Sequence, residues 1–136
     1  MGFEMVALAC GLVLRVIDGD TLEARIALWP GLEVTTVVRL AGIDTPERRA
    51  RCAEERAAAE AATVALRELV EAARGRVCLS DVEPGTYRGR VAARVWLPDD
   101  ALEAAEALLV AGHGRRYDGT TRRRGWCPPG PTPATP

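Results

Sequence analysis

Two turn signals divide the first 40 residues into three short apolar runs, and this pattern limits the possible folds most strongly. Asp18-Gly19 is a dipeptide typical of tight hairpin turns, and Trp29-Pro30-Gly31 interrupts the chain again. The runs that they separate are rich in Val, Ile, Leu and Thr, and the second alternates apolar with charged residues. We therefore expect three consecutive strands, at 6–17, 21–28 and 32–40.

The rest of the chain predicts two helices and two further strands. Residues 52–73 consist mainly of Ala, Glu and Arg, with leucines at helical spacing, and predict a helix. Two apolar runs, 76–82 and 89–97, predict strands, and a second helix is expected from 99 or 100 to 110. The expected order is β-β-β-α-β-β-α, which is the order of a five-stranded Greek-key barrel of the OB type. The predicted fold class is therefore mainly β with helices (α+β).

Length and composition indicate one globular domain over residues 1–127. The 136-residue chain is 48% hydrophobic and 27% charged, and residues 128–136 hold five prolines that predict a disordered tail. No run approaches the ~18 uncharged apolar residues of a membrane-spanning helix, so no membrane partner is expected. The first residues lack the basic start of a signal peptide. The compartment stays open: secreted or periplasmic if a leader was removed, otherwise cytoplasmic.

Four cysteines occur without the spacing of a zinc site. Cys10 and Cys78 stand inside apolar strand-like runs and are expected to be buried thiols. Cys52 and Cys127 stand in polar surroundings, where a disulfide would tie the C-terminal segment to the start of the first helix. That bridge is a hypothesis, with free thiols as the alternative, and it would imply an oxidising compartment.

Acidic and basic residues at strand ends suggest a metal site for phosphate chemistry. Asp20 and Asp44 each lie beside a turn, and the ends of a three-stranded meander can converge. Two carboxylates with a backbone carbonyl and waters suit Ca²⁺. Cleavage of a phosphodiester also needs a base, for which Glu47 is a candidate, and cations around the phosphate. Arg39 and Arg90, in apolar strand runs, could bind the phosphate by forked hydrogen bonds.

Each of these features also has a structural explanation. Asp44 could cap the first helix, with Pro46 in its first turn and Glu47 completing a capping box. Asp18-Gly19 could be a turn and nothing more. Arg39 and Arg90 could make structural ion pairs with Glu47 or Asp44. The net charge of −1 gives no bulk electrostatic argument for nucleic acid.

Three motifs in order carry a resemblance to a known family. They are Val16-Ile17-Asp18-Gly19-Asp20-Thr21, Val38-Arg39-Leu40-Ala41-Gly42-Ile43-Asp44-Thr45-Pro46-Glu47 and Gly89-Arg90-Val91-Ala92. Together they resemble the staphylococcal nuclease (thermonuclease) family over residues 13–117, and the segment 117–127 is similar to the ending of a bacterial subgroup. The resemblance implies a Ca²⁺-dependent nuclease that hydrolyses phosphodiester bonds of DNA and RNA and leaves 3′-phosphate ends.

The resemblance also implies a role for individual residues. The metal ligands would be Asp20, Asp44 and the backbone carbonyl of Thr45. The catalytic residues would be Glu47, which activates water, and Arg39 and Arg90, which clamp the phosphate. Asp18 would lie near the metal and its waters.

The expected substrate contacts depart from the family pattern. The position that stacks a nucleobase in the family is similar to Arg88 here, with Tyr87 displaced by one residue, so base stacking is left open. The residues expected to contact the substrate are Tyr117, Arg122, Arg123 and Arg124. A solvated basic loop is the alternative for the three arginines. The alternative function is a non-catalytic OB-fold module that binds nucleic acid or protein, and the chain is expected to be a monomer.

Overall fold

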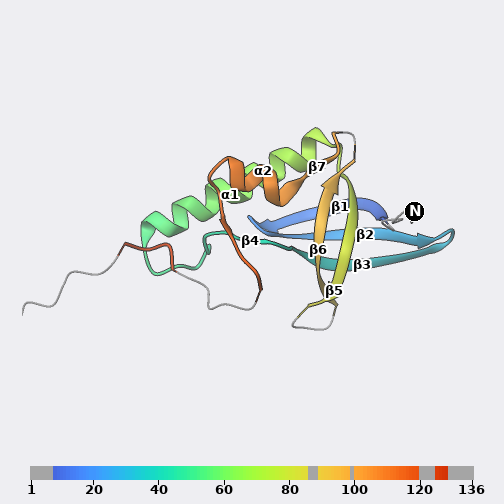
Figure 1. The fold of residues 1–136 in the computed structure, drawn as a ribbon, viewed down its shortest axis with the longest axis horizontal. Helices are drawn as coiled ribbons and strands as arrows, with labels where there is room; N and C mark the ends of the chain where they lie inside the picture. The colour runs from blue at the N-terminus through green and yellow to red at the C-terminus, as the bar shows by residue number, and fades with distance from the viewer. Residues whose placement is uncertain (1–7, 86–88, 99, 120–124, 129–136) are drawn as a thin grey trace, which may run out of the picture.

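The computed structural model describes residues 8–85, 89–98, 100–119 and 125–128 (Figure 1). Its elements in chain order are β1 (Ala9–Asp18), β2 (Thr21–Trp29), β3 (Leu32–Leu40), β4 (Ile43–Asp44), α1 (Ala53–Ala72), β5 (Arg76–Pro84), β6 (Arg90–Leu97), β7 (Leu102–Glu103), α2 (Ala104–Val110) and β8 (Arg115–Arg116). Among the described residues, no helix is both long and apolar enough to cross a membrane.

Five long strands close into a barrel. Their order is β3-β2-β1-β5-β6, with antiparallel neighbours throughout, and a parallel pairing of β3 with β6 closes the ring. This pairing places Val37 opposite Arg90 and Leu40 opposite Ala93. With two helices outside the barrel, the architecture is consistent with an OB-like α+β fold (Figure 1).

The core forms where the apolar faces of barrel and helices meet. Along β2, Leu22, Ala24 and Ile26 are buried, as the two-residue period of a half-buried strand requires. Leu66 of α1 and Leu108 of α2 belong to the same apolar cluster, so both helices cover the barrel. The burial of these side chains is the main stabilising contribution to the fold.

Crowding between β1 and β2 requires a glycine. A Cβ atom at Gly11 would lie 1.9 Å from the carbonyl oxygen of Arg25 on β2. Any other residue at this position would therefore force the two strands apart. Gly11 thus lies where two backbones approach closely.

The structure confirms the expected mainly β class, with five long strands and two helices, and differs in detail. Three strands of two residues each, β4, β7 and β8, were not expected. The second helix begins at Ala104 rather than at 99 or 100, because Leu102 and Glu103 pair with β6 as β7 before the helix starts. The predicted tail, apart from Pro128, and residues 6 and 7 of the first expected strand lie outside the described residues.

The capping-box interpretation of Asp44 and Glu47 is wrong. Helix α1 begins at Ala53, and its N-cap is Cys52, whose Sγ accepts a hydrogen bond from the Glu55 amide at 3.4 Å. Asp44 lies in β4 and pairs with Arg115 of β8, so its backbone is in a sheet and not at a helix terminus. Local spacing alone could not reveal the segment that separates β4 from α1.

Two disulfides join distant parts of the chain. Cys52 is bonded to Cys127, which attaches the C-terminal segment to the start of α1. The expectation that Cys10 and Cys78 are buried thiols is wrong, because the two residues form a disulfide and Cys10 is exposed. The physical reason is the pairing of β1 with β5, which places Cys10 directly opposite Cys78 with a Cα–Cα distance of 4.0 Å.

Candidate functional site

The turn between β1 and β2 carries two acidic residues of the predicted site, Asp18 and Asp20. The Asp20 amide donates a hydrogen bond to Asp18 Oδ1 at 3.1 Å, which closes the turn. Gly19 is buried against α1, and a Cβ atom there would lie 2.6 Å from the Cβ of Ala62. The turn can therefore lie on the helix only with glycine at this position, and the same residues form both a turn and part of the candidate site.

Asp20 and Asp44 meet at one guanidinium group. Arg39 Nη2 lies 3.6 Å from Asp20 Oδ2 and 3.8 Å from Asp44 Oδ1, and it donates a hydrogen bond to the Ile43 carbonyl at 3.3 Å. Both aspartates are buried, with 5% and 4% of their surfaces exposed. The Thr45 amide donates to Asp20 Oδ2 at 3.4 Å, so the Thr45 backbone lies beside the Asp20 carboxylate.

Barrel topology explains this convergence. Arg39 of β3 pairs with Thr21 of β2, which places its side chain close to the β1–β2 turn. The Leu40 amide donates to the Asp20 carbonyl at 2.8 Å, so the end of β3 is tied to the same turn. Asp44 follows on the short strand β4. The structural ion pair considered for Arg39 is therefore present with Asp44, and it includes Asp20 as well.

Partial burial and the neighbouring Asp20 perturb the Asp18 carboxyl. Burial raises the pKa of the Asp18 carboxyl, and the neighbouring Asp20 side chain and its charge raise it further, to about 6 from 3.8. Asp20 Oδ1 accepts a hydrogen bond from the Thr21 hydroxyl at 2.9 Å. Negative charge is thus concentrated at this end of the barrel, where Arg39 contacts two of the three aspartates.

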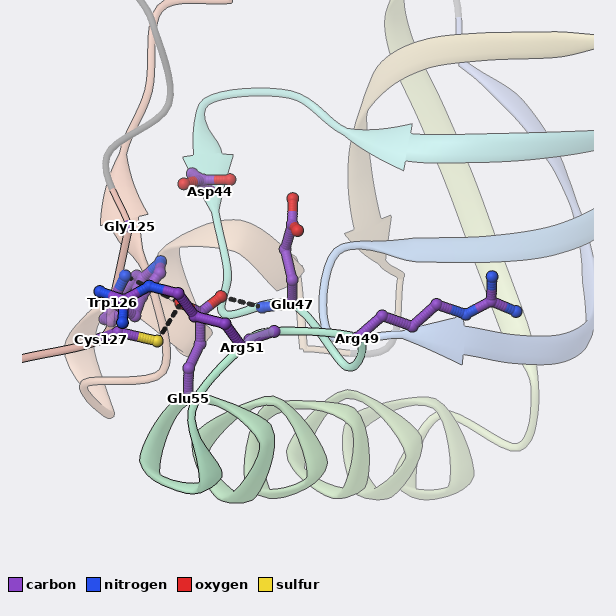
Figure 2. A pocket seen from close by; sticks show the side chains of 9 residues that line it. Asp44, Glu47, Arg49, Arg51, Glu55, Gly125, Trp126 and Cys127 are labelled. Atoms are coloured by element: carbon purple, nitrogen blue, oxygen red, sulfur yellow. Dashed lines mark hydrogen bonds between the residues drawn. The ribbon is translucent and has the colours of Figure 1, made fainter.

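A pocket of about 740 Å³ brings most of the predicted site residues together. Those that line it are Asp18, Asp20, Arg39, Thr45, Glu47 and Arg90. Asp44 lines a smaller adjacent pocket of about 310 Å³, shown in Figure 2. Glu47 and Arg49 line both pockets, so the loop between β4 and α1 forms the wall that the two share.

The backbone and the side chain of Glu47 face different parts of the structure. Its backbone amide donates a hydrogen bond to Glu55 Oε2 of α1 at 2.9 Å. Its carboxylate is exposed and points away from α1 (Figure 2). A side chain in this position can reach a reactant in the pocket while its backbone stays attached to the helix.

The C-terminal segment covers the Asp44 side of the site. The Tyr117 amide donates to the Gly42 carbonyl at 3.0 Å, and the Arg39 guanidinium carbon lies 5.3 Å from the centre of the Tyr117 ring. Tyr117 is thus placed next to the arginine of the site. The other predicted substrate contacts lie outside the described residues; these are Tyr87, Arg88, Arg122, Arg123 and Arg124.

Several residues that line the pockets, among them Arg48, Arg49 and Glu55, were not singled out as site residues from the sequence. Arg48 and Arg49 line the larger pocket, and Arg48 Nη1 donates to the Ile17 carbonyl at 2.7 Å. Their position directly after Glu47 was the available signal. Glu55 had none, because a glutamate in a helix rich in Glu and Arg resembles a solvent-facing residue, yet it is only 6% exposed.

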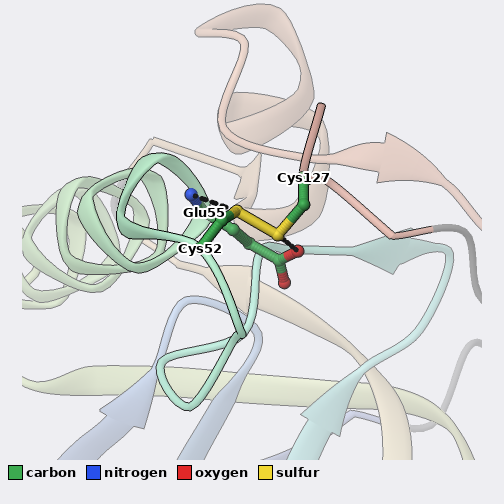
Figure 3. Close-up of side chains that lie close together, drawn as sticks. All are labelled: Cys52, Glu55 and Cys127. Atoms are coloured by element: carbon green, nitrogen blue, oxygen red, sulfur yellow. Dashed lines mark hydrogen bonds between the residues drawn. A yellow bond between two sulfur atoms is a disulfide. The ribbon is translucent and has the colours of Figure 1, made fainter. Parts of the chain in front are cut away.

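The carboxylate oxygens beside Arg39 are the ones in this site that could hold a hard divalent cation. Asp20 and Asp44 offer carboxylate oxygens close to one point, and the Thr45 backbone adjoins them. Oxygen donors of this kind suit Ca²⁺. By contrast, the group formed by Cys52, Glu55 and Cys127 does not fit a metal, because both sulfurs belong to a disulfide (Figure 3).

No family model and no curated protein matches the chain. The geometry of the site therefore carries the functional argument.

Proposed function

We propose that this protein is a Ca²⁺-dependent nuclease that hydrolyses phosphodiester bonds of DNA and RNA and leaves 3′-phosphate ends. One observation carries the proposal: two buried aspartates converge at Arg39, next to a pocket that also contains Glu47 and Arg90. These are the residue types that phosphodiester hydrolysis requires, namely metal ligands, a base and cations. The staphylococcal nuclease motifs and the OB-like barrel support the same proposal.

Asp20, Asp44 and the Thr45 carbonyl would hold the cation. When bound, Ca²⁺ would supply positive charge that polarises the phosphate and offsets the charge that develops in the transition state. The Arg39 guanidinium lies between the carboxylates, so it would turn part of its contacts from Asp20 and Asp44 to the phosphate.

Glu47 is the base in this proposal. Its exposed carboxylate borders the pocket and would take a proton from the attacking water. Arg39 and Arg90 would bind the phosphate oxygens, since a guanidinium group matches a phosphate with two parallel hydrogen bonds. Arg49 adds a further positive charge at the rim, where it would attract the backbone of a nucleic acid.

The two disulfides fit an oxidising compartment, which is where a nuclease that degrades external nucleic acid would act.

A second candidate function is a non-catalytic OB-fold module that binds nucleic acid or protein. The observation that favours it is the ion-pair cluster itself, because Arg39 already contacts both Asp20 and Asp44. In such a module the cluster would only stabilise the barrel end.

Cleavage of a labelled single-stranded DNA distinguishes the two functions. The protein is incubated with Ca²⁺, with a chelator, and as Glu47→Gln, and the new ends are identified chemically. The proposed nuclease cuts only with Ca²⁺, leaves 3′-phosphates and loses most of its rate in Glu47→Gln. Binding of the DNA without cutting, under every metal condition, would support the non-catalytic module instead.

A further inference from the structure

Glu55 is a buried carboxylate that joins two segments far apart in the sequence. Its Oε2 accepts the Glu47 amide at 2.9 Å, and its Oε1 accepts the Trp126 amide at 2.9 Å. Only 6% of its surface is exposed. Figure 2 shows this carboxylate between the loop that carries Glu47 and the C-terminal segment.

Burial of a charged carboxylate is costly unless hydrogen bonds compensate for the lost water. Glu55 lies in the first turn of α1, where the partial positive charge of the helix N-terminus favours an anion. Each carboxylate oxygen is matched to one backbone donor. The Glu55 carboxylate therefore holds both segments at once.

The C-terminal partner of Glu55 is itself anchored. Trp126 precedes Cys127, which is bonded to Cys52 at the N-cap of α1 (Figure 3). The guanidinium of Arg115 lies 3.7 Å from the centre of the Trp126 ring. Arg115 belongs to β8, which pairs with β4, so this anchored segment also runs beside Asp44.

We propose that Glu55 is a positioning residue that holds Glu47 at the pocket, with the Cys52–Cys127 disulfide keeping the second half of the contact in place. This inference rests on the proposed function, because it assigns Glu55 a role through the proposed base. Glu55 accepts a hydrogen bond from the backbone amide of Glu47, and the carboxylate of Glu47 remains at the pocket. It thereby sets where the base stands without touching a reactant.

Glu55→Gln is the informative variant. Both partners of the carboxylate are N–H donors, and an amide offers one acceptor oxygen and one NH₂ donor. The glutamine can therefore accept only one of the two bonds and must turn its NH₂ group toward the other. The matched control is Glu54→Gln, which removes the same charge from the same helical turn at an exposed position.

The first measurement is steady-state cleavage with saturating Ca²⁺. We expect Glu55→Gln to lower kcat roughly 10- to 100-fold, as misplacement of a catalytic group does, with KM within about twofold of the wild type. Ca²⁺ affinity, measured by calorimetry, should stay within about twofold as well, because Glu55 holds neither aspartate. Glu54→Gln should match the wild type in all three quantities.

A double variant shows whether Glu55 acts through Glu47. Glu47→Gln keeps the backbone amide, so the contact with Glu55 survives in it. We expect Glu47→Gln combined with Glu55→Gln to be no more than about threefold slower than Glu47→Gln alone. If the decrease in kcat of the double variant equals the product of the decreases in the two single variants, Glu55 acts independently of Glu47 and the proposal is overturned.

Amide hydrogen exchange tests the contact without relying on activity. The Glu47 amide should lose protection in Glu55→Gln and keep it in Glu54→Gln. Unchanged protection in Glu55→Gln would overturn the proposal. If the wild type cuts no nucleic acid, the proposed function fails, and this exchange measurement alone decides whether Glu55 positions the loop. Should Glu55→Gln not fold, Glu55→Asp, whose stem is too short to hold both donors, takes its place with the same expected results.

Discussion

The two disulfides offer a direct test of the structure, because they should contribute alike to stability and differently to activity. One variant removes the bridge at the site by Cys52→Ser and Cys127→Ala, where serine keeps an N-cap acceptor for α1. The other removes the bridge between β1 and β5 by Cys10→Ala and Cys78→Ala. The second variant is the control, since neither cysteine lines either pocket of the site.

The expected loss of stability follows from the chain closed by each bridge. The cysteines are separated by 75 residues in one disulfide and by 68 in the other. By chain entropy each bridge stabilises the folded state by roughly 4 kcal/mol, and the difference in loop length is worth only about 0.1 kcal/mol. Both variants should therefore have nearly the same free energy of unfolding.

Denaturant unfolding measures this quantity, with linear extrapolation to water for both variants and the wild type. Cleavage is then assayed under conditions in which every variant is folded. We expect kcat to fall about tenfold or more without the Cys52–Cys127 bridge, because Trp126 no longer fixes Glu55, and to stay near wild type without the Cys10–Cys78 bridge.

Two results would refute this reasoning. Equal activity of the two variants would show that the C-terminal attachment does not affect the site. A loss of stability for one bridge that exceeds the other by more than about 2 kcal/mol would show that loop entropy does not dominate their contributions.

Three further predictions concern the site and the turn that supports it. Asp44→Asn should weaken Ca²⁺ binding about tenfold or more in calorimetry because a charged ligand is lost, and unchanged affinity would remove Asp44 from the metal site. Arg90→Ala should slow cleavage by about 10²- to 10³-fold through loss of a cation at the phosphate, and cleavage at full rate would exclude Arg90 from catalysis. Gly19→Ala should destabilise the fold by about 1–3 kcal/mol in thermal unfolding, because its Cβ would meet that of Ala62 at 2.6 Å. In a double-mutant cycle, Gly19→Ala should cost less in an Ala62→Gly background than in the wild type, and an equal cost in both would place the strain elsewhere.

The long strands of the barrel could be predicted from the sequence because their apolar residues and the turns between them form local patterns. The strand 32–40 has the expected bounds. The alternation in the second strand predicted that Leu22, Ala24, Ile26 and Leu28 form its buried face; the first three are buried, whereas Leu28 is exposed. The short strands β4, β7 and β8 were missed, since pairs of residues carry no periodicity. The helix expected at 52–73 agrees with α1 at Ala53–Ala72. The capping box considered at Asp44 and Glu47 is wrong because spacing alone cannot show where a helix begins.

The sequence by itself determined the alternation of strands and helices, the Asp18-Gly19 turn and the set of acidic and basic residues on which the site is built. Those properties depend on neighbours in the chain. Only the tertiary structure decided that Asp20 and Asp44 meet at Arg39, that Cys10 lies opposite Cys78, and that Glu55 joins Glu47 to Trp126. These contacts depend on barrel closure and on the packing of α1, which bring together side chains that no local pattern relates.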